Sequence, residues 1–120
     1  MNLITEGGGA IEFFSDSESL ISGELKRFSV YRQNERLLLD LDITLLYSKK
    51  FKDVTLRFID VLEYSFYYKN HNSFYYIEDY KFFVTAEQAY ISLDPVDGSG
   101  NEIDPNDNDF VIAKELKVYV

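Results

Sequence analysis

Hydrophobic and polar residues alternate along the middle of this chain. Leucine or isoleucine stands at every second position from Leu37 to Leu45, and the positions between them are mostly polar, including Asp40 and Asp42. A period of two directs successive side chains to opposite faces, so this segment is predicted to be a strand with one buried face. Residues 53–60 repeat the pattern after a Lys-rich break. Two such strands joined by a short polar connection favour an antiparallel hairpin at the centre of the fold.

A third strand before this hairpin extends it into a meander. The three predicted strands are residues 24–32, 36–47 and 53–60. If the second turn centres near residues 49–50, Asp42 lies opposite Arg57 on the solvent face. A cross-strand pair of opposite charges contributes about 0.2–1 kcal/mol, so this pair is interpreted as structural.

The rest of the chain is predicted to add short strands and little helix. Gly7–Gly9 is interpreted as a turn after a short strand or loose end, because residues 10–14 make no convincing helix opening. The aromatic segment 74–84 is either a strand in its first half or a link into a strand at 80–85. The other predicted strands are 61–68, 89–94 and a final strand made of 110–113 and 116–120, with a long polar loop over 95–109.

Seven or eight short strands predict an all-β fold. An antiparallel β-sandwich or a half-open barrel would bury the apolar face of each strand. The length of 120 residues fits a single domain, 1–120. Ten Tyr, ten Phe and no Trp agree with this prediction, because aromatic residues favour strands.

Negative charge is concentrated in one segment of the chain. The sequence has 12 Lys and Arg against 21 Asp and Glu, a net charge of −9. Residues 82–113 contain seven acidic residues and no Lys or Arg, so they account for seven of the nine excess charges. Such a field repels phosphate backbones and attracts basic partners or cations. Nucleic-acid binding is therefore not expected.

Cysteine is absent, which excludes disulfides and thiolate chemistry. No basic, apolar signal segment is visible at the start of the sequence, and charges interrupt every apolar run well before the ~20 residues of a membrane helix. We expect a cytoplasmic protein without a membrane partner.

Closely spaced Asp and Asn residues make the segment 94–109 a candidate Ca²⁺ loop, because Ca²⁺ prefers hard oxygen ligands. Counted from Asp97, the EF-hand pattern fails, since its Gly position holds Glu102 and its final Glu position holds Asn108. The next segment resembles the D-x-N-D-N calcium linker of cadherin domains, and its candidate ligands are Asp104, Asn106, Asp107 and Asn108. The alternative is a solvated loop built from good turn-forming residues.

Nothing in the sequence indicates an enzyme. His71 is the only histidine, and it lies between two Asn residues in a predicted turn. Pairs of carboxylates could serve as acid and base, but any acidic protein contains such pairs. We therefore predict no catalytic residue and no cofactor.

Aromatic residues make up half of the segment from Tyr64 to Phe83. If the strands alternate, half of these rings fill the core and the others stand on a surface. Tyr buries a large area at low entropic cost and is enriched at protein interfaces, so Tyr67, Tyr75 and Tyr76 are candidate anchors for a partner. The alternative, to which we give equal weight, is that these aromatic rings fill both faces of a sandwich core.

The first half of the chain resembles a family of small acidic bacterial domains. The segment 11–17 (IEFFSDS), a strand of the Leu37–Leu45 type and the segment 56–61 (LRFIDV) are similar to β-rich bacterial domains of unknown function, including immunity proteins of polymorphic toxin systems. The resemblance implies a non-enzymatic inhibitor that binds a cognate toxin and blocks its active site.

The favoured hypothesis is a non-enzymatic protein-binding domain, specifically an immunity-type inhibitor that docks an acidic loop onto a basic partner such as a toxin domain. The predicted partner-binding residues are Asp94, Asp97, Glu102, Asp104, Asp107 and Asp109, with Tyr67, Tyr75 and Tyr76. A small-ligand or Ca²⁺-binding β module is the alternative, and a carboxylate-dependent enzyme comes third. The sequence leaves the oligomeric state open.

Overall fold

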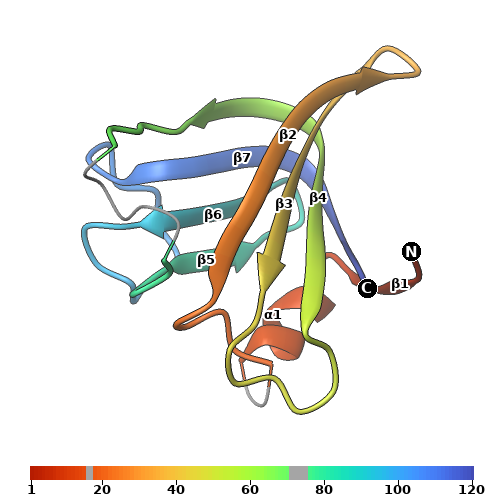
Figure 1. The fold of residues 1–120 in the computed structure, drawn as a ribbon. Helices are drawn as coiled ribbons and strands as arrows, with labels where there is room; N and C mark the ends of the chain where they lie inside the picture. The colour runs from red at the N-terminus through yellow and green to blue at the C-terminus, as the bar shows by residue number, and fades with distance from the viewer. Residues whose placement is uncertain (16–17, 71–75) are drawn as a thin grey trace.

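A computed structural model describes residues 1–15, 18–70 and 76–120 (Figure 1). Its elements are β1 (Leu3–Glu6), α1 (Gly9–Phe14), β2 (Glu24–Gln33), β3 (Arg36–Thr44), β4 (Asp53–Ser65), β5 (Lys81–Val84), β6 (Ala89–Asp94) and β7 (Asn108–Tyr119). The strands form one antiparallel sheet in the order β2-β3-β4-β7-β6-β5, and β1 pairs with the C-terminal end of β7. The sheet does not close on itself, which confirms the all-β prediction of a sandwich or open barrel. No helix in the described ranges is long and apolar enough to cross a membrane.

The predicted meander is present as β2–β4, but its register differs from the prediction. Thr44 pairs with Asp53, so the connection between β3 and β4 centres one residue earlier than expected. Arg57 therefore lies opposite Asp40 and donates two hydrogen bonds to its carboxylate, at 2.9 and 3.0 Å. Asp42 instead lies opposite Thr55.

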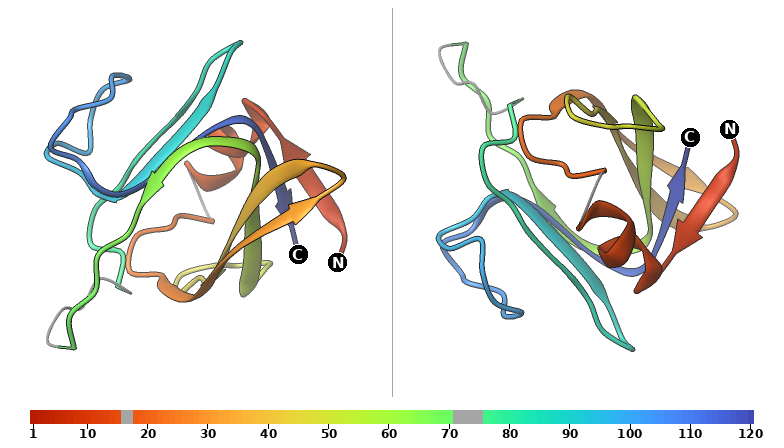
Figure 2. Two further views of the ribbon diagram at one scale, coloured as in Figure 1. Left: turned by 90° about the horizontal axis from the view of Figure 1, so that it is seen from above. Right: turned by 90° about the horizontal axis from the view of Figure 1, so that it is seen from below.

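β4 is one continuous strand where the sequence pattern predicted two. A bulge between Val61 and Glu63, next to Asp60 with its φ of 59°, bends the strand instead of ending it. The first part of β4 pairs with β3 on one side, and β7 pairs with it on the other side from Thr55 to Ser65. Because of this bend, β2–β4 and β5–β7 curl toward each other across the core (Figure 2).

α1 is a short helix that the sequence pattern did not predict. Its buried residues, Ala10 and Phe14, enter the core. The ring of Phe14 contacts Phe82 of β5, and Phe13 contacts Phe51 before β4, at centroid distances of 6.1 and 6.0 Å. The helix therefore covers the core between the two halves of the sheet (Figure 1). A helix of six residues is marginal alone, so tertiary packing explains it.

The second half of the chain follows the predicted order with corrected boundaries. β5 matches the alternative that places a strand at 80–85, and β6 matches the predicted strand 89–94. The predicted final strand is present as β7, which begins at Asn108, so the long polar loop ends at residue 107 and not at 109.

The core is lined by the alternating residues of the predicted central hairpin and by matching positions of β6 and β7. Its largest members below 2% exposure are Phe14, Phe58, Leu20, Leu39, Leu41, Ile43, Leu56, Ile77, Ile91, Leu116 and Val111. Burial of these side chains is the main source of stability in a fold of this size.

Replacement of a core side chain tests this arrangement. Phe58→Ala should lower the free energy of unfolding by about 3–5 kcal/mol in urea denaturation, because it leaves a cavity at a fully buried position. Leu46→Ala, at a residue that is 61% exposed, should change it by less than about 0.5 kcal/mol. Equal losses in the two variants would contradict the assigned core.

Candidate functional site

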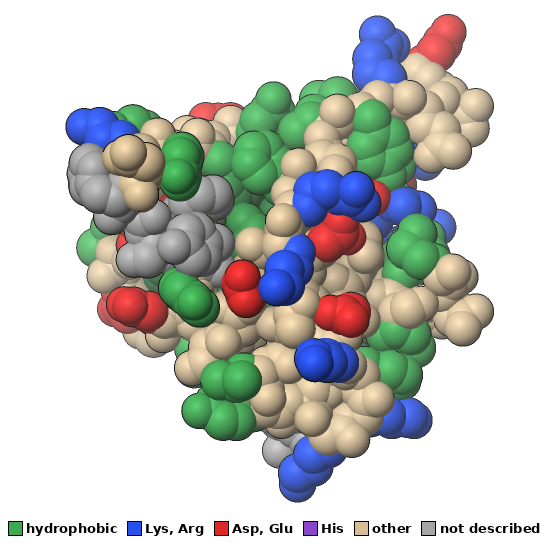
Figure 3. Space-filling model, viewed as in Figure 1, with side chains coloured by type: hydrophobic (Ala, Val, Ile, Leu, Met, Phe, Trp, Pro, Cys, Tyr) green, Lys and Arg blue, Asp and Glu red, His purple; other side chains and the backbone are tan. Residues whose placement is uncertain are grey.

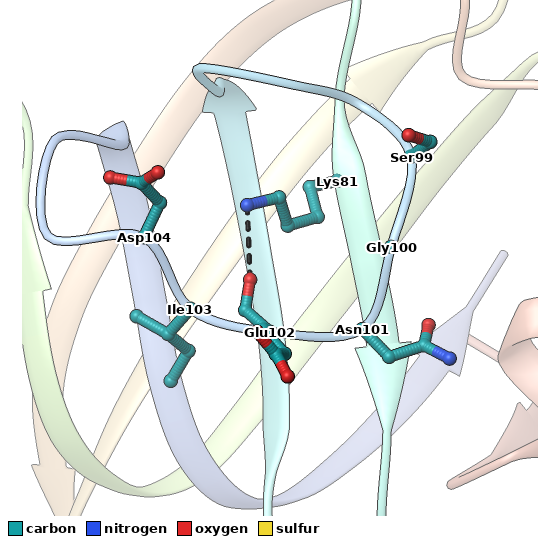
Figure 4. Close-up of a pocket in the computed structure, with 7 residues that line it drawn as sticks. All are labelled: Lys81, Ser99, Gly100, Asn101, Glu102, Ile103 and Asp104. Carbon is teal, nitrogen blue, oxygen red and sulfur yellow. Dashed lines mark hydrogen bonds between the residues drawn. The ribbon is translucent and has the colours of Figure 1, made fainter.

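The acidic loop, residues 95–107, covers one face of β5–β7. Ala89, Ile91 and Leu93 of β6 point into the core, so Tyr90 and Ser92 point to the opposite face. Lys81 lies opposite Ser92 in β5, on that same outer face. The loop curves around the Lys81 side chain (Figure 4).

The Asp107 carboxylate holds this loop to the sheet. It accepts hydrogen bonds from Lys81 Nζ at 2.9 Å and from Tyr90 Oη at 2.6 Å. It also accepts the backbone N–H of Val96 at 2.9 Å and of Asp104 at 3.2 Å. One side chain thus connects β5, β6, the start of the loop and its end.

Lys81 and Asp107 form a buried ion pair. Their side chains are only 5% and 1% exposed. Lys81 Nζ also donates to the backbone carbonyl of Glu102 at 3.0 Å (Figure 4). Because both groups are desolvated, each depends on the other for neutralisation.

The hydrogen bonds around Asp107 keep its carboxyl group charged. Burial raises the pKa of Asp107, but hydrogen bonds from Tyr90, Val96, Lys81 and Asp104 together outweigh it and bring the pKa down to about 2. Burial and the hydrogen bond to this carboxylate raise the pKa of Tyr90. At neutral pH, Tyr90 is therefore a neutral donor to a charged acceptor.

Asp109 is also buried, and it connects the loop to the aromatic segment after β4. Its carboxylate accepts the backbone N–H of Tyr67 at 3.0 Å, and its backbone has a φ of 49°. Burial raises the pKa of Asp109. This contact places Tyr67 beside the base of the acidic loop.

The structure thus divides the predicted acidic residues into two groups. Asp107 and Asp109 are buried and bonded within the fold, so they are not available on the surface. Asp94, Asp97 and Glu102 are exposed, and Asp104 is half-buried with its Oδ1 accepting the backbone N–H of Asn106 at 2.8 Å.

One more exposed carboxylate, Asp79, lies against the loop, and the sequence pattern did not indicate it. A Cβ added at Gly98 would collide with the carboxylate of Asp79, so Asp79 packs directly against the loop. Glu78 precedes it and is also exposed. No local pattern indicates this approach, because the two segments are distant in sequence. The acidic surface is defined here as Glu78, Asp79, Asp94, Asp97, Glu102 and Asp104.

A cavity of about 460 Å³ lies inside the curve of the loop. It is lined by Lys81, Ser99, Gly100, Asn101, Glu102, Ile103 and Asp104 (Figure 4). The one cationic group in this lining is Lys81, whose Nζ already binds Asp107 and the Glu102 carbonyl. The cavity therefore offers an anionic ligand no unpaired positive charge.

Two of the predicted Ca²⁺ ligands, Asp104 and Asp107, accept hydrogen bonds within the fold. Asp107 uses both carboxylate oxygens within the fold, and Asp104 binds the backbone of Asn106. Asn108 starts β7, where it pairs with Asp94. Across residues 1–15, 18–70 and 76–120, no group of three or more His, Asp or Glu side chains is arranged to hold a metal ion.

The aromatic segment supplies both core and surface residues. Tyr67 and Tyr76 are 56% and 50% exposed, whereas Phe82 and Tyr80 pack against the core. Tyr75 and His71 lie outside the described residues.

Hydrophobic side chains also gather on the surface between β2 and the end of β4 (Figure 3). There, Phe28 stacks on Phe66 with ring centroids 4.7 Å apart. Tyr64 is 42% exposed on the side of β4 that faces the core, since it pairs with the buried Val111. The acidic loop lies on the outer side of β5–β7 (Figure 2), whereas Phe28 stands on the core-facing side of β2, opposite Leu41. Tyr67 is held to Asp109 at the base of the loop.

Comparison with protein-family models, curated proteins and solved structures finds no match to this chain. The resemblance to immunity proteins therefore stays a prediction.

Removal of the Asp107 charge tests the organisation of the loop. Asp107→Asn should lower the free energy of unfolding by about 3–5 kcal/mol, because it leaves the buried Lys81 ammonium without a counter-charge. Asp97→Asn, at an exposed carboxylate, is the matched control and should cost less than about 0.5 kcal/mol. The double variant Lys81→Met with Asp107→Asn should be more stable than Asp107→Asn alone. A double variant that is less stable would contradict the buried pair.

Acid should weaken the fold through the same carboxylate. The pKa of Asp107 is about 2 in the folded chain, below the roughly 3.9 of an unfolded Asp. The folded chain therefore binds this proton less readily than the unfolded chain does. The resulting stability, on the order of 2 kcal/mol, is fully present above about pH 4 and is lost as the pH falls through about 2. Denaturation of wild type and Asp107→Asn should show a smaller loss for the variant over this range, and parallel profiles would refute the assignment.

Proposed function

We propose that this chain is a non-enzymatic protein-binding domain whose acidic surface docks onto a basic partner. The specific form we favour is an immunity-type inhibitor of a toxin in the bacterial cytoplasm. The observation that carries the proposal is that the exposed carboxylates stand on a loop fixed by a buried ion pair, Lys81–Asp107. The absence of cysteine is compatible with the cytoplasmic location.

A fixed loop supports docking for an energetic reason. A flexible acidic loop would lose conformational entropy on binding, and that loss would weaken the complex. The hydrogen bonds of Asp107 to Val96 and Asp104 restrict the loop before a partner arrives. Carboxylates held in this way attract a basic surface and raise the rate of association.

Tyr67 supports a contact next to the acidic surface. Its backbone is held by Asp109 at the base of the loop, and its ring is largely exposed. Tyr at such a position can bury a large area in an interface at low entropic cost. Within this proposal, the acidic surface sets the rate of association and Tyr67 slows dissociation.

The titratable groups at the site favour binding over catalysis. Asp107, Lys81 and Tyr90 are the most buried of them, and they bond to one another. A general acid or base must be able to reach a substrate proton. These three groups are directed inward, so the proposal assigns them a structural role.

Association kinetics with a basic protein encoded beside this chain would test the proposal. The on-rate should fall at least about tenfold between 50 and 500 mM salt, because screening removes electrostatic attraction. Neutralising three exposed acids together, Asp94→Asn, Asp97→Asn and Glu102→Gln, should lower the low-salt on-rate by about tenfold. Tyr67→Ala should instead raise the off-rate.

The control variant neutralises three exposed acids elsewhere, Glu12→Gln, Glu35→Gln and Glu87→Gln, which lie on α1 and in two hairpin turns. Its net charge matches that of the test variant, so it should keep most of the wild-type on-rate. An on-rate that is indifferent to salt, or equal losses in the two variants, would reject the acidic surface as the docking site.

A further inference from the structure

β2 is a long strand at the edge of the sheet. It pairs with β3 along its length, and among the described residues its other side carries one isolated bridge, between Glu24 and Tyr76. From Phe28 to Gln33, no described residue pairs with that other side. The β2–β3 hairpin also projects beyond the rest of the molecule at this end (Figure 1), so the edge is accessible there.

The geometry of the hairpin identifies which backbone groups face this open edge. The connection between β2 and β3 is a two-residue turn, and both of its residues, Asn34 and Glu35, have positive φ, at 52° and 65°. In such a hairpin the flanking pair, Gln33 and Arg36, is the hydrogen-bonded pair, and bonded pairs then alternate with non-bonded pairs.

This alternation assigns opposite directions to successive residues of β2. Tyr31 and Ser29 are directed to β3, opposite Leu38 and Asp40. The backbone N–H and C=O groups of the alternate residues are directed to the open edge instead. These residues are Phe28, Val30 and Arg32. Three donors and three acceptors are therefore in line for a further strand.

The side chains next to this edge are apolar on one face. Phe28 and Val30 are 38% and 36% exposed, although both stand on the face that carries the core residues Leu41 and Leu39 of β3. Phe28 also stacks on Phe66, so the apolar surface continues from β2 to the chain beyond β4. A further strand with apolar residues on this face would cover them.

The charged residues of β2 indicate which charge the added strand should carry. β2 has three basic residues, Lys26, Arg27 and Arg32, and one acidic residue, Glu24, which pairs with Lys26 at 3.3 Å, within a chain of net charge −9. The Arg27 side chain remains 73% exposed although its Nε binds Asp42. A second copy of β2, paired antiparallel, would bring these bases together, which is unfavourable. An acidic segment would instead be attracted.

We propose that the open edge of β2 accepts an extended segment of a partner protein by strand addition. The segment has apolar residues at alternate positions, which lie beside Phe28 and Val30, and carboxylates at the positions between them, on the face that carries Arg27. Main-chain hydrogen bonds provide the attachment, and the side chains select the sequence. This surface is separate from the acidic surface and has the opposite charge preference, so it does not rest on the function proposed above.

The test uses a synthetic peptide, acetyl-Thr-Val-Glu-Val-Glu-Val-Thr-amide, and amide hydrogen exchange measured by NMR at 150 mM salt. At saturating peptide, the amides of Phe28, Val30 and Arg32 should exchange at least tenfold more slowly. The amides of Ser29 and Tyr31 should not change, because they already bond to β3. This alternation distinguishes strand addition from contact with the apolar side chains alone.

Two control peptides separate the backbone contribution from the charge contribution. N-methylation of alternate residues along the bonding edge of the peptide should abolish the protection, and Lys in place of both Glu residues should weaken binding at least tenfold. In the protein, Val30→Pro removes one donor from the open edge without removing a bond to β3 and should abolish binding, whereas Val30→Ile should retain it. The N-methylated peptide keeps the test decisive if Val30→Pro fails to fold.

Three results would overturn the proposal. The first is no protection of these amides at millimolar peptide. The second is protection without the alternation. The third is protection that rises with protein concentration in the absence of peptide, because a second copy would then occupy the edge.

Discussion

The Asp107 carboxylate is the contact on which the outer layer of this protein depends. Residues 95–107 have no regular secondary structure, so the loop contributes few bonds of its own. Its position is set by one buried acceptor that binds Lys81, Tyr90 and the backbone at both ends of the loop. A buried ion pair often adds little net stability compared with apolar residues of the same size, whereas breaking it is costly. Its role here is to fix one loop conformation.

The bend in β4 separates the molecule into surfaces of different character. Because the strand continues through its bulge, it pairs with β7 beyond the part that pairs with β3, and the sheet curls around the core. The acidic loop covers the outside of β5–β7. The apolar surface beside Phe28 and Phe66 lies on the inside, at the open end of the curl. A basic partner on the acidic surface and an acidic strand on β2 would therefore occupy different sides of the molecule.

Period-two alternation was sufficient to predict the central strands and the all-β class, because each of these strands buries one face. It did not fix the register, since the position of the turn between β3 and β4 depends on contacts such as the one from Leu45 N to Lys52 O at 2.7 Å. It also missed α1, whose six residues become helical by burying Ala10 and Phe14 in a core assembled from distant strands.

The candidate site was predicted less completely than the fold. Composition located the acidic segment, but it could not show which carboxylates are buried. Asp107 and Asp109 look like their neighbours in sequence, and only the approach of Lys81 and of the Tyr67 backbone distinguishes them. Lys81 lies just outside the base-free segment, so its role as the counter-charge was not visible. Asp79 was missed for the same reason, because its contact with Gly98 is long-range.

Backbone ¹⁵N relaxation of residues 96–106 would test most directly the claim that the Asp107 contacts fix the acidic loop. With the carboxylate in place, the order parameters should approach the ~0.85 typical of rigid backbone, as in β6 and β7. In Lys81→Met they should fall for the loop and remain unchanged for the strands. Order parameters below about 0.6 across the wild-type loop would contradict the account, because the exposed carboxylates would then stand on a flexible segment.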